Sequence, residues 1–130
     1  MVETVKDYMI PKEEVVTPDD SVTAAIDLMV ERDSGSVIVV DREERPVGIF
    51  TERDLLRHAR IHQAKFMSLK ISEVMSSPVH TVTRDTPLSS AIRIMKEKGI
   101  SRVPVVDEEG RLTGLLFWRD ILYGMAFSRL

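Results

Sequence analysis

The sequence predicts a mixed α/β protein made of two copies of one β-α-β-β-α unit. Residues 5–56 align with residues 71–122 at a constant offset of 66 positions, without a gap, and about a third of the aligned positions are identical. Both copies end in the same pattern of a glycine, an apolar pair, an arginine and an aspartate, at 48–54 and at 114–120. Because only two copies are present, we expect a pair that packs on itself, not an open solenoid.

The first helix of each copy is predicted by apolar residues at helical spacing. These residues are Val22, Ala25, Ile26 and Met29 in the first copy and Leu88, Ala91, Ile92 and Met95 in the second. Asp20 or Ser21 marks the start of the first helix, because either side chain can accept a hydrogen bond from a free backbone N–H. In the second copy Thr86 precedes Pro87, which we expect at the first helical position, and Gly99 ends the helix.

Strands surround this helix in each copy. The β-branched runs 37–40 and 103–106 are short enough to be buried strands. A short segment before each helix, at 15–17 and 79–83, is predicted to be a further strand. Pro104 cannot donate a ladder hydrogen bond, so we expect it at the start or at the edge of its strand.

A hairpin and a second helix complete each copy. Polar residues at 41–45 and 107–111 predict the hairpin turns. Each turn leads into a strand that passes directly into a helix at Thr51 or Phe117. The basic run 57–70 contains no acidic residue, and we expect it to extend the first of these helices and then cross to the second copy. No recognition motif accompanies it, so a solvated linker helix, or attraction toward the phosphates of a ligand, is favoured over nucleic-acid contact.

Composition excludes several classes of protein. Of 130 residues, 43% are hydrophobic and 30% are charged, and the net charge of −3 gives no general attraction to nucleic acid or anionic membranes. The absence of cysteine excludes disulfides and thiolate metal sites. The N-terminus lacks the pattern of a signal peptide, and no apolar run approaches the roughly 20 residues of a membrane-spanning helix. We therefore expect a cytoplasmic protein with no nucleic-acid or membrane partner.

Thr51 and Asp54 have two interpretations. Their spacing is that of a capping box, which is purely structural. The second copy favours a further role, because Phe117 cannot cap although Arg119 and Asp120 are retained. A carboxylate can accept hydrogen bonds from two neighbouring ribose hydroxyls, and a phosphate is favoured at a helix N-terminus. We predict ligand contact, with capping as a simultaneous role in the empty protein.

The chain resembles a tandem pair of CBS domains, a family named for cystathionine β-synthase. The Gly-x-x-Thr-x-x-Asp ending at Gly48–Asp54 and the match of Ile100–Asp107 to the family's central strand carry this resemblance, which covers about 5–122. It implies two tandem β-α-β-β-α units with pseudo-twofold symmetry, often called a Bateman module. The expected division is a first repeat at 1–62, a linker at 63–70 and a second repeat at 71–130.

The resemblance also implies two clefts between the repeats that hold adenosine-containing ligands. The first nucleotide-binding set is Thr51, Arg53, Asp54, His80, Ile100, Ser101, Arg102, Val103 and Pro104. The set of the second, weaker cleft is Ser34, Gly35, Val37, Ile38, Phe117, Arg119 and Asp120. In the first cleft the base is expected to rest on Ile100, Val103 and Pro104. The second is expected to be weaker because Phe117 replaces the hydroxyl and Ile38 replaces the proline, although stacking of the aromatic ring on a base is an alternative role.

The function implied is regulatory and non-enzymatic, with no required cofactor. The expected ligand is AMP, ADP or ATP, as in energy sensing, and occupancy would be passed to a regulated protein partner. Two alternatives remain open: a sensor of S-adenosylmethionine or a dinucleotide, and a structural or dimerisation module with vestigial clefts. An enzyme is the weakest interpretation, because the sequence shows no nucleophile with a base beside it and no metal cluster.

Two surface features of the sequence lead to further predictions. His58 and His62 lie four positions apart on a helix, but without a third ligand a solvated face is favoured and no metal site is predicted. Trp118, Leu122 and Met125, within an apolar helix end that runs to Phe127, are predicted to form a homodimer interface.

Overall fold

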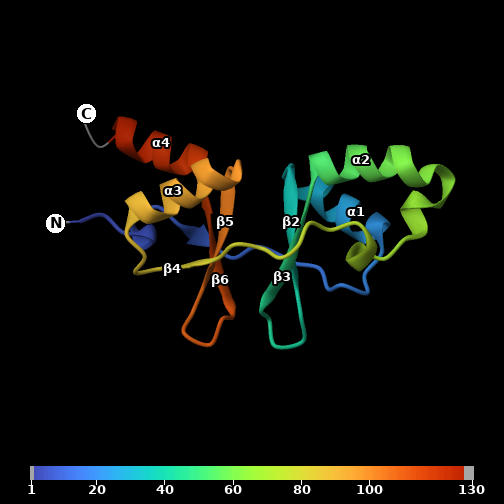
Figure 1. Cartoon of the computed structure of the whole chain (residues 1–130), viewed down its shortest axis with the longest axis horizontal. Coiled ribbons are helices and arrows are strands. Elements are labelled where there is room, and N and C mark those ends of the chain that lie inside the picture. Colours follow the sequence, from blue (N-terminus) through green and yellow to red (C-terminus); the bar gives the residue numbers. More distant parts are fainter. Residues whose placement is uncertain (1, 128–130) are drawn as a thin grey trace. The chain divides into compact units, whose positions relative to one another are not determined.

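The computed structural model describes residues 2–127, and the chain divides into two compact units (Figure 1). The central unit comprises residues 14–79, and the terminal unit combines residues 1–13 with residues 80–130. The elements of the central unit are α1 (Val22–Arg32), β2 (Ser36–Val40), β3 (Pro46–Thr51), α2 (Glu52–His62) and the 3-10 helices η2 (Gln63–Ser68) and η3 (Ile71–Glu73). Those of the terminal unit are η1 (Val5–Asp7), β1 (Ile10–Pro11), β4 (Val82–Thr83), α3 (Leu88–Lys98), β5 (Arg102–Val106), β6 (Leu112–Phe117) and α4 (Trp118–Phe127).

The order of elements confirms the predicted β-α-β-β-α pattern. The terminal unit has a sheet in the order β1-β6-β5-β4, in which β4 and β5 are parallel and the other pairs are antiparallel. In the central unit β2 and β3 pair antiparallel. Single bridges extend this pair from Val16 to Val39 and from Ile49 to Ser76. These bridges lie 66 positions from the β4–β5 and β1–β6 pairs, so both units use one topology.

Each unit is completed by the segment at the start of the other repeat: residues 70–79 complete the central unit and residues 3–11 complete the terminal unit. We call these two segments the exchanged segments. The backbone N–H of Leu88, at the start of α3, donates to the Glu3 carbonyl at 2.9 Å. At the equivalent place in the central unit, the N–H of Val22 donates to the Leu69 carbonyl, also at 2.9 Å. The compact units therefore do not coincide with the sequence repeats expected at 1–62 and 71–130. Residue 1 and residues 128–130 of those ranges lie outside the described part of the chain.

Gly48 and Gly114 permit this exchange of segments. A Cβ at Gly48 would lie 2.5 Å from the Met75 sulfur, and one at Gly114 would lie 2.5 Å from the Ile10 carbonyl oxygen. Both distances are shorter than van der Waals contact, so the exchanged segment can lie against β3 or β6 only because the strand carries no side chain there. The glycine of the repeated ending is thus a packing requirement.

Each unit has its own hydrophobic core. The buried core of the central unit consists of Val16, Val22, Ala25, Met29, Val37, Val39, Phe50, Phe66, Ile71 and Val74. That of the terminal unit consists of Val5, Val82, Leu88, Ala91, Met95, Val103, Val105, Leu116 and Ile121. Phe66 corrects the expectation that the run 57–70 is solvated throughout, because its side chain is only 4% exposed and packs in the core of the central unit.

The helix boundaries agree with the sequence in two places and differ in one. Ser21 caps α1 by accepting a hydrogen bond from the Ala24 backbone, and Gly99 ends α3 in the left-handed conformation, both as predicted. Pro87 is the N-cap of α3, one position before the expected first helical position, because its extended ψ of 136° joins it to the preceding loop. Within residues 2–127 no helix is long and apolar enough to cross a bilayer.

Pro104 lies in the middle of β5 and not at its start. It is opposite Leu115 of β6, whereas β4 reaches only Val105 and Val106 on the other side of β5. The missing N–H therefore falls beside the end of β4, where the strand is locally an edge. The expectation is correct for the edge and wrong for the strand's start.

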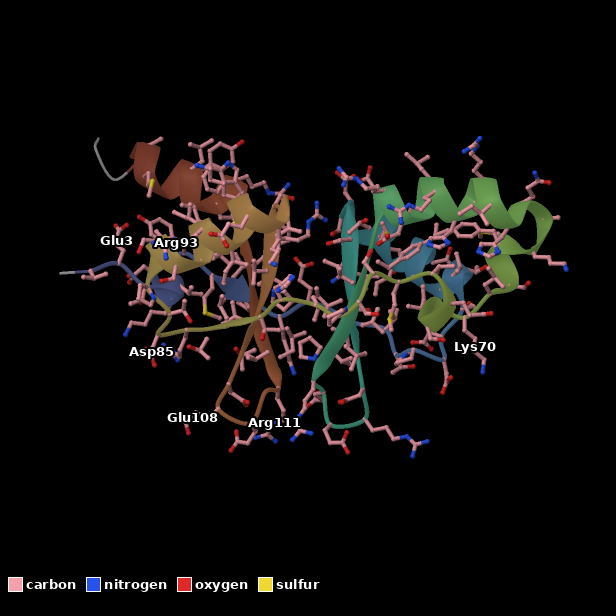
Figure 2. All side chains as sticks on the ribbon, viewed as in Figure 1. Glu3, Lys70, Asp85, Arg93, Glu108 and Arg111 are labelled. Atoms are coloured by element: carbon pink, nitrogen blue, oxygen red, sulfur yellow. The ribbon has the colours of Figure 1, made fainter. Side chains whose placement is uncertain are left out.

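Aspartates organise the predicted hairpin turns. The Asp107 carboxylate accepts hydrogen bonds from the backbone N–H groups of Glu109 and Arg111, each at 2.9 Å, and Asp41 accepts the equivalent pair. The bond from the Arg111 backbone lowers the pKa of the Asp107 carboxyl below its ordinary value. Glu108 and Arg111 mark this turn in Figure 2.

Candidate ligand site

The start of α2 is a complete capping box. Thr51 is the N-cap, and its hydroxyl accepts from the backbone N–H of Asp54 at 3.2 Å. The Asp54 carboxylate in return accepts from the backbone N–H of Thr51 at 3.0 Å. The structural half of the sequence prediction is therefore confirmed. Asp54 is also only 4% exposed, which is rare for a carboxylate. A carboxylate buried in this way has lost its contact with water, so hydrogen bonds from the protein have to compensate for that loss.

A third residue, Ser76, completes the set around Asp54. Its hydroxyl donates to Asp54 Oδ1 at 2.7 Å, while the Thr51 hydroxyl and backbone N–H share Oδ2. Two donor hydroxyls thus lie on one buried carboxylate, each on a different oxygen. Sequence reasoning missed Ser76 because it lies 22 positions from Asp54, in the exchanged segment. The 66-residue offset does hold a signal, since the counterpart of Ser76 is the apolar Ile10.

The candidate wall of the first repeat lies beside this same helix start. The N–H of Glu52 donates to the Gly35 carbonyl at 3.1 Å, and Ser36 pairs with Thr51 across β2 and β3. The Ser34 hydroxyl donates to the Ser36 carbonyl at 3.0 Å. These contacts hold the loop before β2 against the first turn of α2. Arg53, from the same turn, is exposed.

The equivalent place in the terminal unit is chemically different. The N–H of Trp118 donates to the Ser101 carbonyl at 2.8 Å, so the backbone arrangement is the same in the two units. Phe117 stands where Thr51 stands and is only 9% exposed. The guanidinium carbons of Arg102 and Arg119 lie 5.8 Å and 5.1 Å from the centre of its ring. The expected role of this ring in stacking on a base stays a prediction.

Asp120 differs from Asp54 in the same way. It is half-buried, and within residues 2–127 its side chain makes no hydrogen bond. Neither a hydroxyl at position 117 nor one at Ile10 is present to bind it. The two equivalent carboxylates therefore have very different surroundings: one is held by three donors and one is open.

Several other candidate residues are placed by the structure. Val37 and Val103 belong to the cores of their own units, so the expectation that the Val103 side chain supports a base needs correcting. Ile38 and Pro104 are also buried, Ile100 is partly buried and His80 is exposed. The structure brings each wall beside the helix start of its own unit. The predicted pairing of each helix start with the wall of the other repeat stays a prediction.

His58 and His62 stack on α2. Their ring nitrogens Nδ1 and Nε2 are 3.4 Å apart, and the ring planes are inclined by 11°. Among the described residues, no group of three or more histidine, aspartate or glutamate side chains is arranged to hold a metal ion.

Comparison with known proteins identifies the family. The family model of the CBS domain matches twice, over residues 5–60 and residues 71–126. The chain belongs to the CBS domain family. The double match agrees with the internal repeat and defines the protein as a CBS pair.

Solved structures of CBS proteins share the whole fold. The crystal structure of CBSX2 in complex with AMP is 30% identical, covers 98% of both chains and gives a TM-score of 0.86. The CBS domain pair of protein MJ0100, in complex with 5-methylthioadenosine and S-adenosyl-L-methionine, is 25% identical, covers 98% of this chain and 99% of that one, and gives a TM-score of 0.81.

Curated relatives are mostly longer than the matched region. An uncharacterized protein of Methanopyrus kandleri is 36% identical over 116 residues, which is 87% of this chain and 59% of that protein. The inosine-5'-monophosphate dehydrogenase of Methanocaldococcus jannaschii is 35% identical over 107 residues, which is 82% of this chain and only 20% of the enzyme. The chain therefore spans about three fifths or less of these two relatives, and their remaining parts have no counterpart in it.

Proposed function

We propose that this CBS pair is a regulatory, non-enzymatic module that binds an adenosine-containing ligand and passes its occupancy to a protein partner. The observation that carries the proposal is the buried carboxylate of Asp54 at the first turn of α2, with hydroxyls on both of its oxygens. The AMP complex of CBSX2, at 30% identity over 98% of both chains, supports the class of ligand.

Asp54 has the chemistry to hold a ribose. A carboxylate offers about four acceptor positions, and three donor groups occupy Asp54: the Thr51 backbone, the Thr51 hydroxyl and the Ser76 hydroxyl. One ribose hydroxyl can use the remaining position, and its neighbour can replace Ser76. Each such bond to a charged group is worth about 1.5–3 kcal/mol. The exposed Arg53 on the same turn provides a cation for a phosphate.

Replacement of the Ser76 hydroxyl by a ribose hydroxyl would also provide a route for a signal. Ser76 lies in the exchanged segment, and its backbone also bridges to Ile49 of β3. If a ribose hydroxyl takes its place on Asp54, the segment loses one of the bonds that hold it to the central unit. Ligand binding would thereby change the segment 70–79. A partner that contacts this segment would then respond to occupancy.

S-adenosylmethionine is a second candidate ligand. The MJ0100 complex supports it, because that CBS pair is named with 5-methylthioadenosine and S-adenosyl-L-methionine and matches nearly the whole of this chain. Both candidates share the adenosine group that Asp54 would bind. They differ in the group attached to the ribose, which is a phosphate in one and a sulfonium in the other.

Thermal melts with AMP, ATP, S-adenosylmethionine and a guanosine nucleotide test the proposal. A ligand at 100 times its Kd adds about 2.7 kcal/mol to the free energy of unfolding. We expect one of the adenosine ligands to raise the melting temperature and the guanosine nucleotide to leave it unchanged. If no adenosine ligand changes it at millimolar concentration, the clefts are vestigial and the chain is a structural module.

We propose a homodimer as the assembled form. The side chains of Trp118, Leu122, Tyr123 and Met125 on α4 are 38–57% exposed, and apolar surface of this kind usually marks an interface. The side chain of Phe127, part of the same predicted face, lies outside the described residues. One chain has a mass of 14.8 kDa, so light scattering should give about 30 kDa for a twofold pair. A mass of one chain at micromolar concentration would contradict the homodimer.

We also propose a cytoplasmic location, which cell fractionation tests.

A further inference from the structure

Two histidine rings face one another at the end of α2 (Figure 1). His58 and His62 lie one helical turn apart, and α2 ends at His62. Both side chains are half-buried, and His58 Nδ1 lies 3.4 Å from His62 Nε2. Within residues 2–127 neither ring makes another hydrogen bond or an ion pair. The sequence shows only the spacing of these residues, whereas the structure shows that one nitrogen of each ring is turned toward the other.

The distance between these two nitrogens is the one that a shared zinc ion requires. Zinc binds imidazole nitrogen at about 2.0–2.1 Å with tetrahedral geometry, which places two of its nitrogen ligands about 3.3–3.4 Å apart. The square-planar geometry common for copper(II) would bring them to about 2.8–3.0 Å. The ring planes are inclined by only 11°, so each ring has to turn about χ2 before both lone pairs point at one ion. This torsion is broad in histidine, and the turn therefore costs little.

The position of the pair on the helix also favours a bound cation. The carbonyl end of a helix carries a partial negative charge, which attracts cations within the last turn. The N–H of Gln63 closes α2 by donating to the Ala59 carbonyl, so His62 lies at this end. Arg57 and Arg60 are exposed, and the helical repeat places them largely on the other side of α2 from the two rings. Water screens their repulsion of a bound ion.

We propose that His58 and His62 form a zinc-binding site in the central unit. Each ring binds the ion through the nitrogen that faces its neighbour and keeps its proton on the other nitrogen. Two water molecules complete the tetrahedron, so the ion stays exchangeable, unlike the ion of a structural site with four protein ligands. Imidazole suits zinc, whereas magnesium and calcium prefer oxygen ligands. This site replaces the solvated face that the spacing alone favoured, and it does not depend on the adenosine proposal.

Calorimetric titration of the full chain with zinc chloride, in the absence of nucleotide, tests the site. We expect one zinc ion to bind per chain in the wild type. His58→Gln and His62→Gln should each weaken binding at least about tenfold, because the second imidazole of a chelating pair binds at a high effective concentration. Magnesium chloride and calcium chloride should show no binding that these two substitutions remove.

His80→Gln is the matched control. His80 is the remaining histidine of the chain and is exposed in the terminal unit, so this variant makes the same chemical change away from α2. It should leave the Kd for zinc unchanged. NMR of the imidazole C–H groups gives a second readout, in which zinc should shift the signals of His58 and His62 together and leave those of His80 in place. Far-ultraviolet circular dichroism and a thermal melt without zinc confirm that each variant is folded.

The outcomes distinguish a shared ion from other ways of binding zinc. Weaker binding in both α2 variants, with wild-type binding in His80→Gln, supports the site. If only one of His58→Gln and His62→Gln binds zinc more weakly, that histidine acts alone and the shared site is wrong. The site is also overturned if the wild type binds no zinc at millimolar concentration, if both α2 variants bind it as the wild type does, or if His80→Gln loses as much affinity as they do.

Discussion

The starts of α2 and α4 occupy equivalent positions in two units of the same topology, and they use opposite chemistry. The first is a hydrogen-bonded set in which Thr51 and Ser76 hold the buried Asp54. The second is a buried ring, Phe117, with a half-buried Asp120 beside it that makes no side-chain hydrogen bond within residues 2–127. The backbone hydrogen bond at the helix start is the same in both units: the N–H of Glu52 donates to the Gly35 carbonyl, and the N–H of Trp118 donates to the Ser101 carbonyl.

This difference shows what the repeat must keep and what it can change. The glycine and the backbone contacts recur because the exchanged segment has to cross each strand closely. The side chains that face the helix start have diverged together: Thr51 against Phe117, and Ser76 against Ile10.

The largest expected effect concerns the two glycines. Gly114→Ala places a methyl group against the Ile10 backbone, which cannot move without disturbing β1, and we expect a loss of about 3 kcal/mol in the free energy of unfolding. Gly48→Ala meets chiefly the flexible Met75 side chain and should cost about 1 kcal/mol. Urea denaturation of both variants measures the difference. Equal losses for the two variants would contradict the difference in packing around Gly48 and Gly114.

Removing the carboxylates should have the next largest effect. Asp54→Ala leaves the Thr51 N–H and the Ser76 hydroxyl without their acceptor and should lower the free energy of unfolding by about 2 kcal/mol. Asp120→Ala removes no hydrogen bond among the described residues and should cost less than about 0.5 kcal/mol. The same denaturation experiment measures both. A larger loss for Asp120→Ala would contradict the comparison.

Ser76→Ala isolates the bond between the exchanged segment and α2. We expect a loss of about 1.5 kcal/mol, because the lost bond is to a charged acceptor. Amide hydrogen exchange of residues 70–79 should become faster at the same time. Ser72→Ala, in the same segment but away from Asp54, is the control and should change neither quantity. Unchanged exchange in Ser76→Ala would show that this bond does not hold the segment.

Thr51 gives the smallest effect. Thr51→Val keeps the shape but removes the capping oxygen and should cost about 1 kcal/mol of stability, whereas Thr51→Ser keeps the cap and should be close to wild type. Thermal melts in the absence of ligand check both. If Thr51→Val is as stable as Thr51→Ser, the hydroxyl is not retained for capping.

The sequence predicted what is periodic and local. The order of elements, the cap at Ser21, the end of α3 at Gly99 and the capping box at Thr51 all result from residue spacing and short-range chemistry. Phe66 was missed because its burial depends on where a short 3-10 helix returns to the core. No local pattern distinguishes it from a residue of a solvated linker.

The candidate site was predictable only in part. The sequence indicated Asp54 and the contrast with Phe117, but not Ser76, because the bond between them joins α2 to a segment exchanged between repeats. It also placed Val103 against a ligand, whereas strand alternation turns this side chain into the core. Arg102 lies 15 positions before Phe117 and is brought to its ring only by the β5–β6 register.

Binding of the adenosine ligand should depend on Asp54 and not on its counterpart Asp120. Calorimetric titration of the wild type, Asp54→Asn and Asp120→Asn with one adenosine ligand tests this most directly, because asparagine keeps the size and one acceptor oxygen. We predict that Asp54→Asn weakens the tightest binding event about 10- to 100-fold, while Asp120→Asn changes it less than about threefold. Wild-type affinity in Asp54→Asn together with lost binding in Asp120→Asn would show that the two sites have been assigned the wrong way round.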